Sequence, residues 1–157
     1  MSKKVLIVEN NVEQLHWLEE LVRAIDKDVW VCAVTNADAA SDILSNQVID
    51  VFLCNVTLDS GNAEDVSGMD LVGEIRKIEK YLFTPVIFIT ERMDFEEEAY
   101  RDLHCYGYIG KPFNTEEITQ TVKKALKYTT QRDVKEYVYF QKDGLVYPVK
   151  CKDIPIQ

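Results

Sequence analysis

The side chains best suited to chemistry in this sequence stand where short apolar segments end. Glu9 ends the first segment and Asn10 follows it, while Asn55 comes directly after the third. A carboxylate can pair with a lysine, and carboxylate or amide oxygens can bind a hard cation such as Mg²⁺. Because no nucleophile stands beside a base, an enzyme with its own turnover is the reading that these residues favour least. The full set of candidates is Glu9, Asn10, Asn55, Thr90, Tyr108, Lys111 and Pro112.

The elements that must position these residues follow from the hydrophobic pattern. Near-continuous apolar segments alternate with longer stretches of helical spacing, which predicts an α/β fold: a doubly wound, five-stranded parallel sheet with helices on both faces. In such sheets functional groups gather outside the carboxyl ends of the strands, which is where the candidates fall. The expected strands are 4–9, 29–34, 48–54, 86–90 and 105–109, and the expected helices are 12–25, 37–44, 68–78, 94–103 and 115–128.

Net charge, the length of the apolar runs and the spacing of the cysteines argue against several classes of function. The 157 residues carry a formal net charge of −9, and residues 1–132 hold all of it, with 14 basic and 23 acidic residues. Phosphate backbones require Lys and Arg, so we expect no nucleic-acid contact by residues 1–130. The apolar runs are far shorter than a membrane span, and the first residues lack a signal-peptide pattern, which predicts a cytoplasmic protein without a membrane partner. The four cysteines form no CxxC pair, so neither a zinc site nor a disulfide framework is expected.

Four segments together resemble the receiver domain of response regulators over residues 3–128. They are VLIVEN, DVFLCNVTL, VIFIT and YGYIGKPF. The resemblance implies a flavodoxin-like fold and a role in two-component, phosphorelay signal transduction that regulates transcription. It places Glu9 and Asn10 on the family's acidic pair and Asn55 on its phosphoacceptor. Thr90 and Tyr108 fall on the switch positions, and Lys111-Pro112 on the phosphate-pairing lysine and its cis peptide bond.

The sequence departs from the family in its chemistry. The family transfers a phosphoryl group from a phosphohistidine to an aspartate, and the neutral amide of Asn55 cannot act as that nucleophile. The usual Mg²⁺ site loses two carboxylates at Asn10 and Asn55, which leaves Glu9 as the one weak metal ligand. We therefore predict a pseudo-receiver with no catalytic residue and no cofactor. It would act by protein contact, as a homodimer through the fourth helix, fifth strand and fifth helix, with a histidine kinase as the partner that the resemblance implies.

Two alternatives stay open at this point. The chain could be a conventional Mg²⁺-dependent, phosphorylatable receiver in which the Asp of position 55 has been engineered to Asn. It could instead be a ligand-binding or scaffold domain whose altered pocket holds an anion or metabolite between Glu9, Asn55, Thr90 and Lys111. A substitute phosphoacceptor at Asp59 in the extended loop is disfavoured, because a loop carboxylate lacks the fixed geometry of a strand end.

Residues 131–157 are expected to form a linker and a β-hairpin. Strands at 134–141 and 145–151 flank Lys142-Asp143-Gly144, a turn signal, and Pro148 suggests an edge strand. An isolated hairpin is marginal in water, so it must pack on the first domain, pair with another chain or begin something larger. The segment resembles the opening hairpin of the LytTR-type DNA-binding domain. We therefore expect a truncated chain whose missing C-terminal domain binds DNA.

Overall fold

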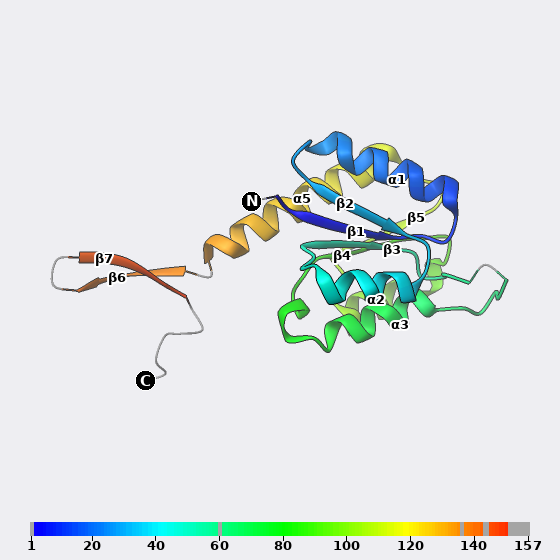
Figure 1. Ribbon diagram of the computed structural model, residues 1–157. Helices are drawn as coiled ribbons and strands as arrows, with labels where there is room; N and C mark the ends of the chain where they lie inside the picture. The colour runs from blue at the N-terminus through cyan, green and yellow to red at the C-terminus, as the bar shows by residue number, and fades with distance from the viewer. Residues whose placement is uncertain (1, 60, 136, 143–144, 151–157) are drawn as a thin grey trace.

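The sheet predicted from the sequence forms the centre of the molecule. The computed structural model describes residues 2–59, 61–135, 137–142 and 145–150, with side chains described as far as residue 130. A five-stranded parallel sheet runs through it in the order β2-β1-β3-β4-β5, and Figure 1 shows these strands between the helices. Its strands are β1 Lys4–Val8, β2 Trp30–Val34, β3 Val51–Cys54, β4 Val86–Thr90 and β5 Gly107–Gly110.

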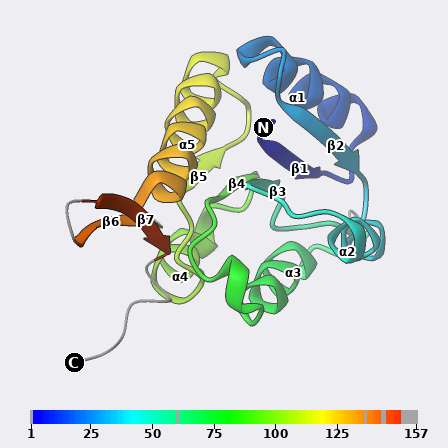
Figure 2. The same ribbon diagram turned by 60° about the vertical axis from the view of Figure 1, so that its left-hand side comes forward.

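Helices cover both faces of this sheet, as predicted for a flavodoxin-like fold. Figure 2 shows α1 and α5 on one face and α2, α3 and α4 on the other. Two 3₁₀ turns, η1 Glu79–Tyr81 and η2 Met93–Phe95, precede β4 and α4. The helices are α1 Val12–Ile25, α2 Ala37–Asn46, α3 Ser67–Arg76, α4 Glu96–Leu103 and α5 Thr115–Lys135.

The strands contribute side chains to two separate hydrophobic cores, because successive side chains of a strand point to opposite faces of the sheet. In β1, Val5 and Ile7 pack under α1 and α5, while Leu6 and Val8 pack under the helices of the other face. This two-sided burial explains why the strands appear in the sequence as continuous apolar runs. Asparagine side chains begin the first two helices: Asn11 accepts from Gln14 N at 3.0 Å and Asn36 accepts from Ala39 N at 2.8 Å.

Several predicted boundaries were wrong at the ends of elements. Strand β3 begins at Val51 rather than at 48, and the stretch expected as one helix from 94 begins as the 3₁₀ turn η2. Helix α5 continues to Lys135, seven residues beyond its expected end at 128. The physical reason is that residues 115–135 contain no glycine or proline to end a helix.

The C-terminal hairpin is present as two antiparallel strands. They are β6 Tyr137–Lys142 and β7 Leu145–Lys150, and Tyr139 pairs with Pro148. The predicted turn at Asp143-Gly144 and the last predicted strand residue, Cys151, lie outside the described residues. Within the described part of the chain, no helix combines the length and the apolar character that crossing a membrane requires.

Candidate functional site

The predicted site residues meet at one edge of the sheet, where β1, β3, β4 and β5 end. Val8 pairs with Cys54, so Glu9 and Asn55 leave neighbouring strands at the same level. The backbone continues this register, because Asn55 N donates to the Val8 carbonyl at 3.0 Å and Lys111 N donates to the Thr90 carbonyl at 2.8 Å. The peptide bond between Lys111 and Pro112 is cis, as the resemblance implied. The structure therefore brings Glu9, Asn55, Thr90 and Lys111 to one edge of the sheet.

Glu9 is the centre of the site and its charge is fully engaged. Its Oε1 accepts from Lys111 Nζ at 2.6 Å, and the two side chains are only 1% and 7% exposed. Its Oε2 accepts from Asn55 Nδ2 and from Asn11 N, both at 3.1 Å. A buried carboxylate is tolerated when a cation and further donors satisfy it. We call Glu9, Asn55 and Lys111 the pocket floor.

Asn10 adds a second neutral amide to this cluster. In one orientation of its amide, Oδ1 accepts from Asn55 Nδ2 at 3.3 Å. With oxygen and nitrogen exchanged, the nitrogen donates to Glu9 Oε2 at 2.9 Å and to the Thr57 carbonyl at 3.1 Å. The positions of oxygen and nitrogen in an asparagine amide are assigned from the hydrogen bonds that each orientation makes. In both orientations, Asn10 and Asn55 bind protein groups around Glu9.

These donors do not fit a magnesium site. Mg²⁺ requires near-octahedral oxygen ligands and is usually held through one or two carboxylates plus water and phosphate oxygens. Among Glu9, Asn10 and Asn55 only Glu9 is a carboxylate, and both of its oxygens already accept protein hydrogen bonds. Among the residues that the structure describes, no group of three His, Cys, Asp or Glu side chains could hold a metal ion.

Thr90 lines the same pocket as Asn55 and Lys111, and both Thr90 and Tyr108 are hydrogen-bonded to Arg92. Thr90 is fully buried at the end of β4, and its Oγ1 accepts from Arg92 N at 3.0 Å. The Tyr108 ring packs against Phe88 with ring centroids 5.9 Å apart, and its hydroxyl donates to the Arg92 carbonyl. Burial, with Asp94 and Glu96 nearby, raises the pKa of Tyr108 to about 12. The hydroxyl therefore remains a hydrogen-bond donor at neutral pH.

A pocket of about 380 Å³ opens above the floor. Its lining comes from the loops after β1, β3, β4 and β5, and it is predominantly polar in residue type. Sequence reasoning missed Arg92, which stands in this lining two residues after Thr90. The available signal was a basic residue just beyond the carboxyl end of a predicted strand. The lining residues are Asn10, Asn11, Gln14, Asn55, Thr57, Asn62, Ala63, Thr90, Glu91, Arg92 and Lys111.

The extended loop between β3 and α3 uses its own carboxylates to hold its shape. Asp65 Oδ2 accepts from Ser67 Oγ at 2.6 Å and from the backbone N–H groups of Leu58, Asp59 and Ser67. Burial acts to raise the pKa of Asp65, but these hydrogen bonds outweigh it and the net shift is downward. Asp59 accepts from Gly61 N at 3.1 Å. Both carboxylates stabilise loop turns and neither lines the pocket.

Gly68 places this loop and α3 close to Asn55. A Cβ atom at Gly68 would lie 1.7 Å from the backbone oxygen of Asn55. Gly68 N also donates to the Val56 carbonyl at 2.8 Å. The start of α3 can approach Asn55 this closely only because position 68 has no side chain.

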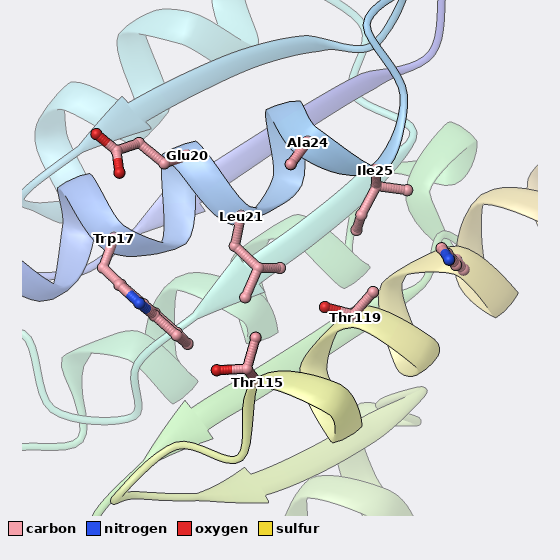
Figure 3. Close-up of a pocket in the computed structure, with 8 residues that line it drawn as sticks. Trp17, Glu20, Leu21, Ala24, Ile25, Thr115 and Thr119 are labelled. Atoms are coloured by element: carbon pink, nitrogen blue, oxygen red, sulfur yellow. The ribbon is translucent and has the colours of Figure 1, made fainter.

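A second pocket, of about 400 Å³, lies between α1 and α5. Figure 3 shows Trp17 and Leu21 of α1 facing Thr115 and Thr119 of α5. The Trp17 ring stacks on Phe113 at 5.0 Å, and Lys111 Nζ lies 5.6 Å from the centroid of the Phe113 ring. The aromatic pair therefore forms part of the packing that supports the lysine of the pocket floor.

Comparisons with known proteins agree with this geometry. A family model described as "Response regulator receiver domain" matches residues 5–123. The chain is 27% identical over 127 residues to a Porphyra purpurea protein named "Probable transcriptional regulator ycf29", covering 80% of this chain and 57% of that relative. It is also 27% identical over 127 residues to the "Polar-differentiation response regulator DivK" of Brucella ovis, covering 80% of this chain and 98% of the relative.

The solved structures show the same fold. A receiver domain protein, described as CheY-like, from Methanospirillum hungatei JF-1 matches with a TM-score of 0.70 at 17% identity, covering 84% of this chain and 99% of that one. The chain spans a little over half the length of the Porphyra relative. The family match covers most of the chain and includes the strand ends that carry the pocket floor. The chain belongs to the response regulator receiver domain family of two-component signalling.

Proposed function

We propose that this receiver works without phosphorylation and signals by protein contact. The observation that carries the proposal is the pocket floor, where Asn55 stands at the phosphoacceptor position and donates its amide nitrogen to Glu9. An amide nitrogen oriented this way offers no nucleophilic oxygen to a phosphoryl donor. The floor has the composition of a structural hydrogen-bond cluster.

Charge within the site supports the same proposal. The resemblance implies carboxylates at positions 10 and 55, and both are neutral amides here. The remaining carboxylate, Glu9, is matched by Lys111 at 2.6 Å, so the floor carries one negative and one positive charge. A site balanced in this way has little attraction for a divalent cation, which phosphoryl transfer in this family requires.

The contacts of Thr90 and Tyr108 support a site that is assembled without phosphate. Both side chains are buried, and both are hydrogen-bonded to the backbone of Arg92. In the proposed mechanism they transmit the state of the pocket to the face formed by α4, β5 and α5, by biasing an equilibrium between two arrangements. A histidine kinase could still bind this domain as a partner without transferring a phosphoryl group.

The α4, β5 and α5 face is our proposal for the protein contact, as a homodimer. Exposed aromatic residues gather there, namely Tyr100 on α4, Tyr106 just before β5 and Tyr128 on α5. The rings of Tyr106 and Tyr128 lie 6.3 Å apart. Tyrosine is enriched at protein interfaces. Because the Porphyra relative is named a probable transcriptional regulator, we propose that the contact serves the regulation of transcription.

Incubation with acetyl phosphate and Mg²⁺, followed by intact-mass measurement, tests the proposal. We expect the mass of the chain to stay unchanged under conditions that phosphorylate a conventional receiver included in the same reaction. A phosphoryl adduct on this chain would refute phosphorylation independence and favour an acceptor outside position 55.

A further inference from the structure

Arg92 occupies a position that touches both switch residues through its backbone. Its N–H donates to Thr90 Oγ1 at 3.0 Å, and its carbonyl accepts from the Tyr108 hydroxyl. Any shift of the backbone at position 92 therefore changes a hydrogen bond of Thr90 and one of Tyr108 together.

The side chain of Arg92 reaches a different part of the molecule. Its Nη1 donates to the carbonyl of Ala63, in the β3–α3 loop, at 2.8 Å. Its Nε and Nη2 donate to the two carboxylate oxygens of Asp94 at 3.2 and 3.0 Å, and its guanidinium lies 4.8 Å from the centroid of the Phe95 ring. The planar fork of arginine allows both sets of contacts at once, whereas a lysine ammonium could serve only one.

The loop that Arg92 holds is itself well organised. Asp65 Oδ2 accepts hydrogen bonds from the backbone N–H groups of Leu58, Asp59 and Ser67. Asn62 Oδ1 accepts from Glu64 N at 3.0 Å. Ala63 and Asn62 line the pocket. A hydrogen bond to Ala63 therefore positions the whole loop wall of the pocket.

We propose that Arg92 is a positioning residue whose guanidinium ties the β3–α3 loop to the segment that holds Thr90 and Tyr108. The tie deepens the proposed function, on which it rests. It keeps the pocket wall and the switch residues in a single arrangement in the absence of a phosphoryl group. Hydrogen bonds from a charged donor are stronger than neutral ones, so the bond to the Ala63 carbonyl, with the guanidinium held in place by Asp94, suits a tie of this kind.

Amide hydrogen exchange on the full chain tests the tie directly. In Arg92→Ala we expect residues 61–66 to exchange about tenfold faster, because a charged hydrogen bond that closes the loop is lost. Arg92→Lys should fall between this variant and the natural chain. The matched control is Arg101→Ala, since Arg101 forms the same kind of pair with Asp102 at 3.1 Å on α4, and its partners Asp102 and Glu97 both lie on that helix.

The ionisation of Tyr108 gives a second readout that a loss of loop packing alone would not move. Its pKa lies at about 12 when the ring is buried beside Arg92. Releasing the segment should admit water and lower this value toward about 10, the ordinary value for tyrosine, against the smaller, opposite effect of removing the Arg92 charge. Absorbance titration of Arg92→Ala, with and without Tyr108→Phe, isolates the contribution of this one phenol.

The outcomes separate the tie from the proposed function. If residues 61–66 exchange at the same rate in Arg92→Ala as in Arg101→Ala, the tie is overturned. This holds whatever the result of the acetyl phosphate reaction. A phosphoryl adduct on the natural chain overturns phosphorylation independence and leaves the exchange result standing. If Arg92→Ala also speeds exchange in β1 and β3, the variant is unfolding globally. Arg92→Met, which keeps the length of the side chain and removes its donors, then decides the question, and unchanged loop exchange in that variant overturns the tie.

Discussion

Two ion pairs near the same pocket differ in the distance between their charges and in their exposure to solvent. On the pocket floor, Lys111 and Glu9 approach to 2.6 Å with side chains 7% and 1% exposed. At the rim, which we define as Arg92, Asp94 and Ala63, the Arg92–Asp94 pair is 3.0 Å long with side chains 26% and 62% exposed. A buried charge that loses its partner has no water to replace it, whereas an exposed charge has. The floor should therefore control stability, and the rim should control conformation.

The largest expected effect comes from breaking the floor pair. Lys111→Met should lower the free energy of unfolding by about 3–5 kcal/mol, because it leaves the Glu9 carboxylate buried without its cation. Urea denaturation measures this change. The control is Lys111→Met combined with Glu9→Gln, which removes both charges and should recover much of the loss. A loss below about 1 kcal/mol in the single variant would show that the pair behaves like a surface pair.

A second prediction compares two glycines of the same helix. Gly68→Ala should cost about 2 kcal/mol or more, because a Cβ atom would lie 1.7 Å from the Asn55 backbone oxygen. Gly73→Ala should instead stabilise by about 0.5–1 kcal/mol, since the nearest atom to its Cβ is Leu103 Cδ2 at 3.9 Å and alanine favours helix. Thermal unfolding of the two variants checks the contrast. Equal effects would mean that α3 does not depend on its close approach to the floor.

The third prediction concerns alkaline pH and Tyr108, whose hydroxyl donates to the carbonyl of Arg92 at the rim. Because the pKa of Tyr108 is raised to about 12 in the folded protein, its contribution to stability is complete below about pH 10 and is lost as the pH rises toward 12. Burial also raises the pKa values of Cys54 and Cys105, so the natural chain loses stability from several groups there. The free energy of unfolding, measured from pH 9 to 12, should fall less steeply in Tyr108→Phe than in the natural chain. Identical slopes would contradict burial of the phenol.

The smallest effect is expected at the exposed side of the rim. Asp94→Ala should change the free energy of unfolding by no more than about 0.5 kcal/mol, as for other solvent-exposed ion pairs. Urea denaturation in parallel with Lys111→Met gives the direct comparison between rim and floor. A loss of several kcal/mol at Asp94 would remove the distinction between the two regions.

The fold and the pocket floor could be predicted because both depend on periodic features. Five buried strands leave continuous apolar runs in the sequence, and the polar residues that end those runs must meet at one edge of a parallel sheet. Glu9, Asn55 and Lys111 were found in this way, and in the structure Lys111 Nζ donates to Glu9 Oε1. Their roles came from the resemblance, since spacing alone does not distinguish a switch threonine from any strand threonine.

The rim could not be predicted because loops have no periodic signal. The contact between Arg92 and the Ala63 carbonyl joins residues 29 positions apart through a backbone acceptor that any residue type would supply. The stacking of Trp17 on Phe113 depends in the same way on how α1 and the segment before α5 pack. The length of α5 was underestimated because the polar residues after 128 show no hydrophobic period, although nothing there stops a helix.

The most direct test of the central claim compares the natural chain with variants that restore the missing carboxylates. Each is treated with acetyl phosphate and Mg²⁺ and its intact mass is measured. Asn10→Asp combined with Asn55→Asp supplies the nucleophile and a metal ligand beside Glu9, so this variant should gain a phosphoryl group. The account predicts an adduct on the double variant and none on the natural chain. An adduct on the natural chain would contradict it.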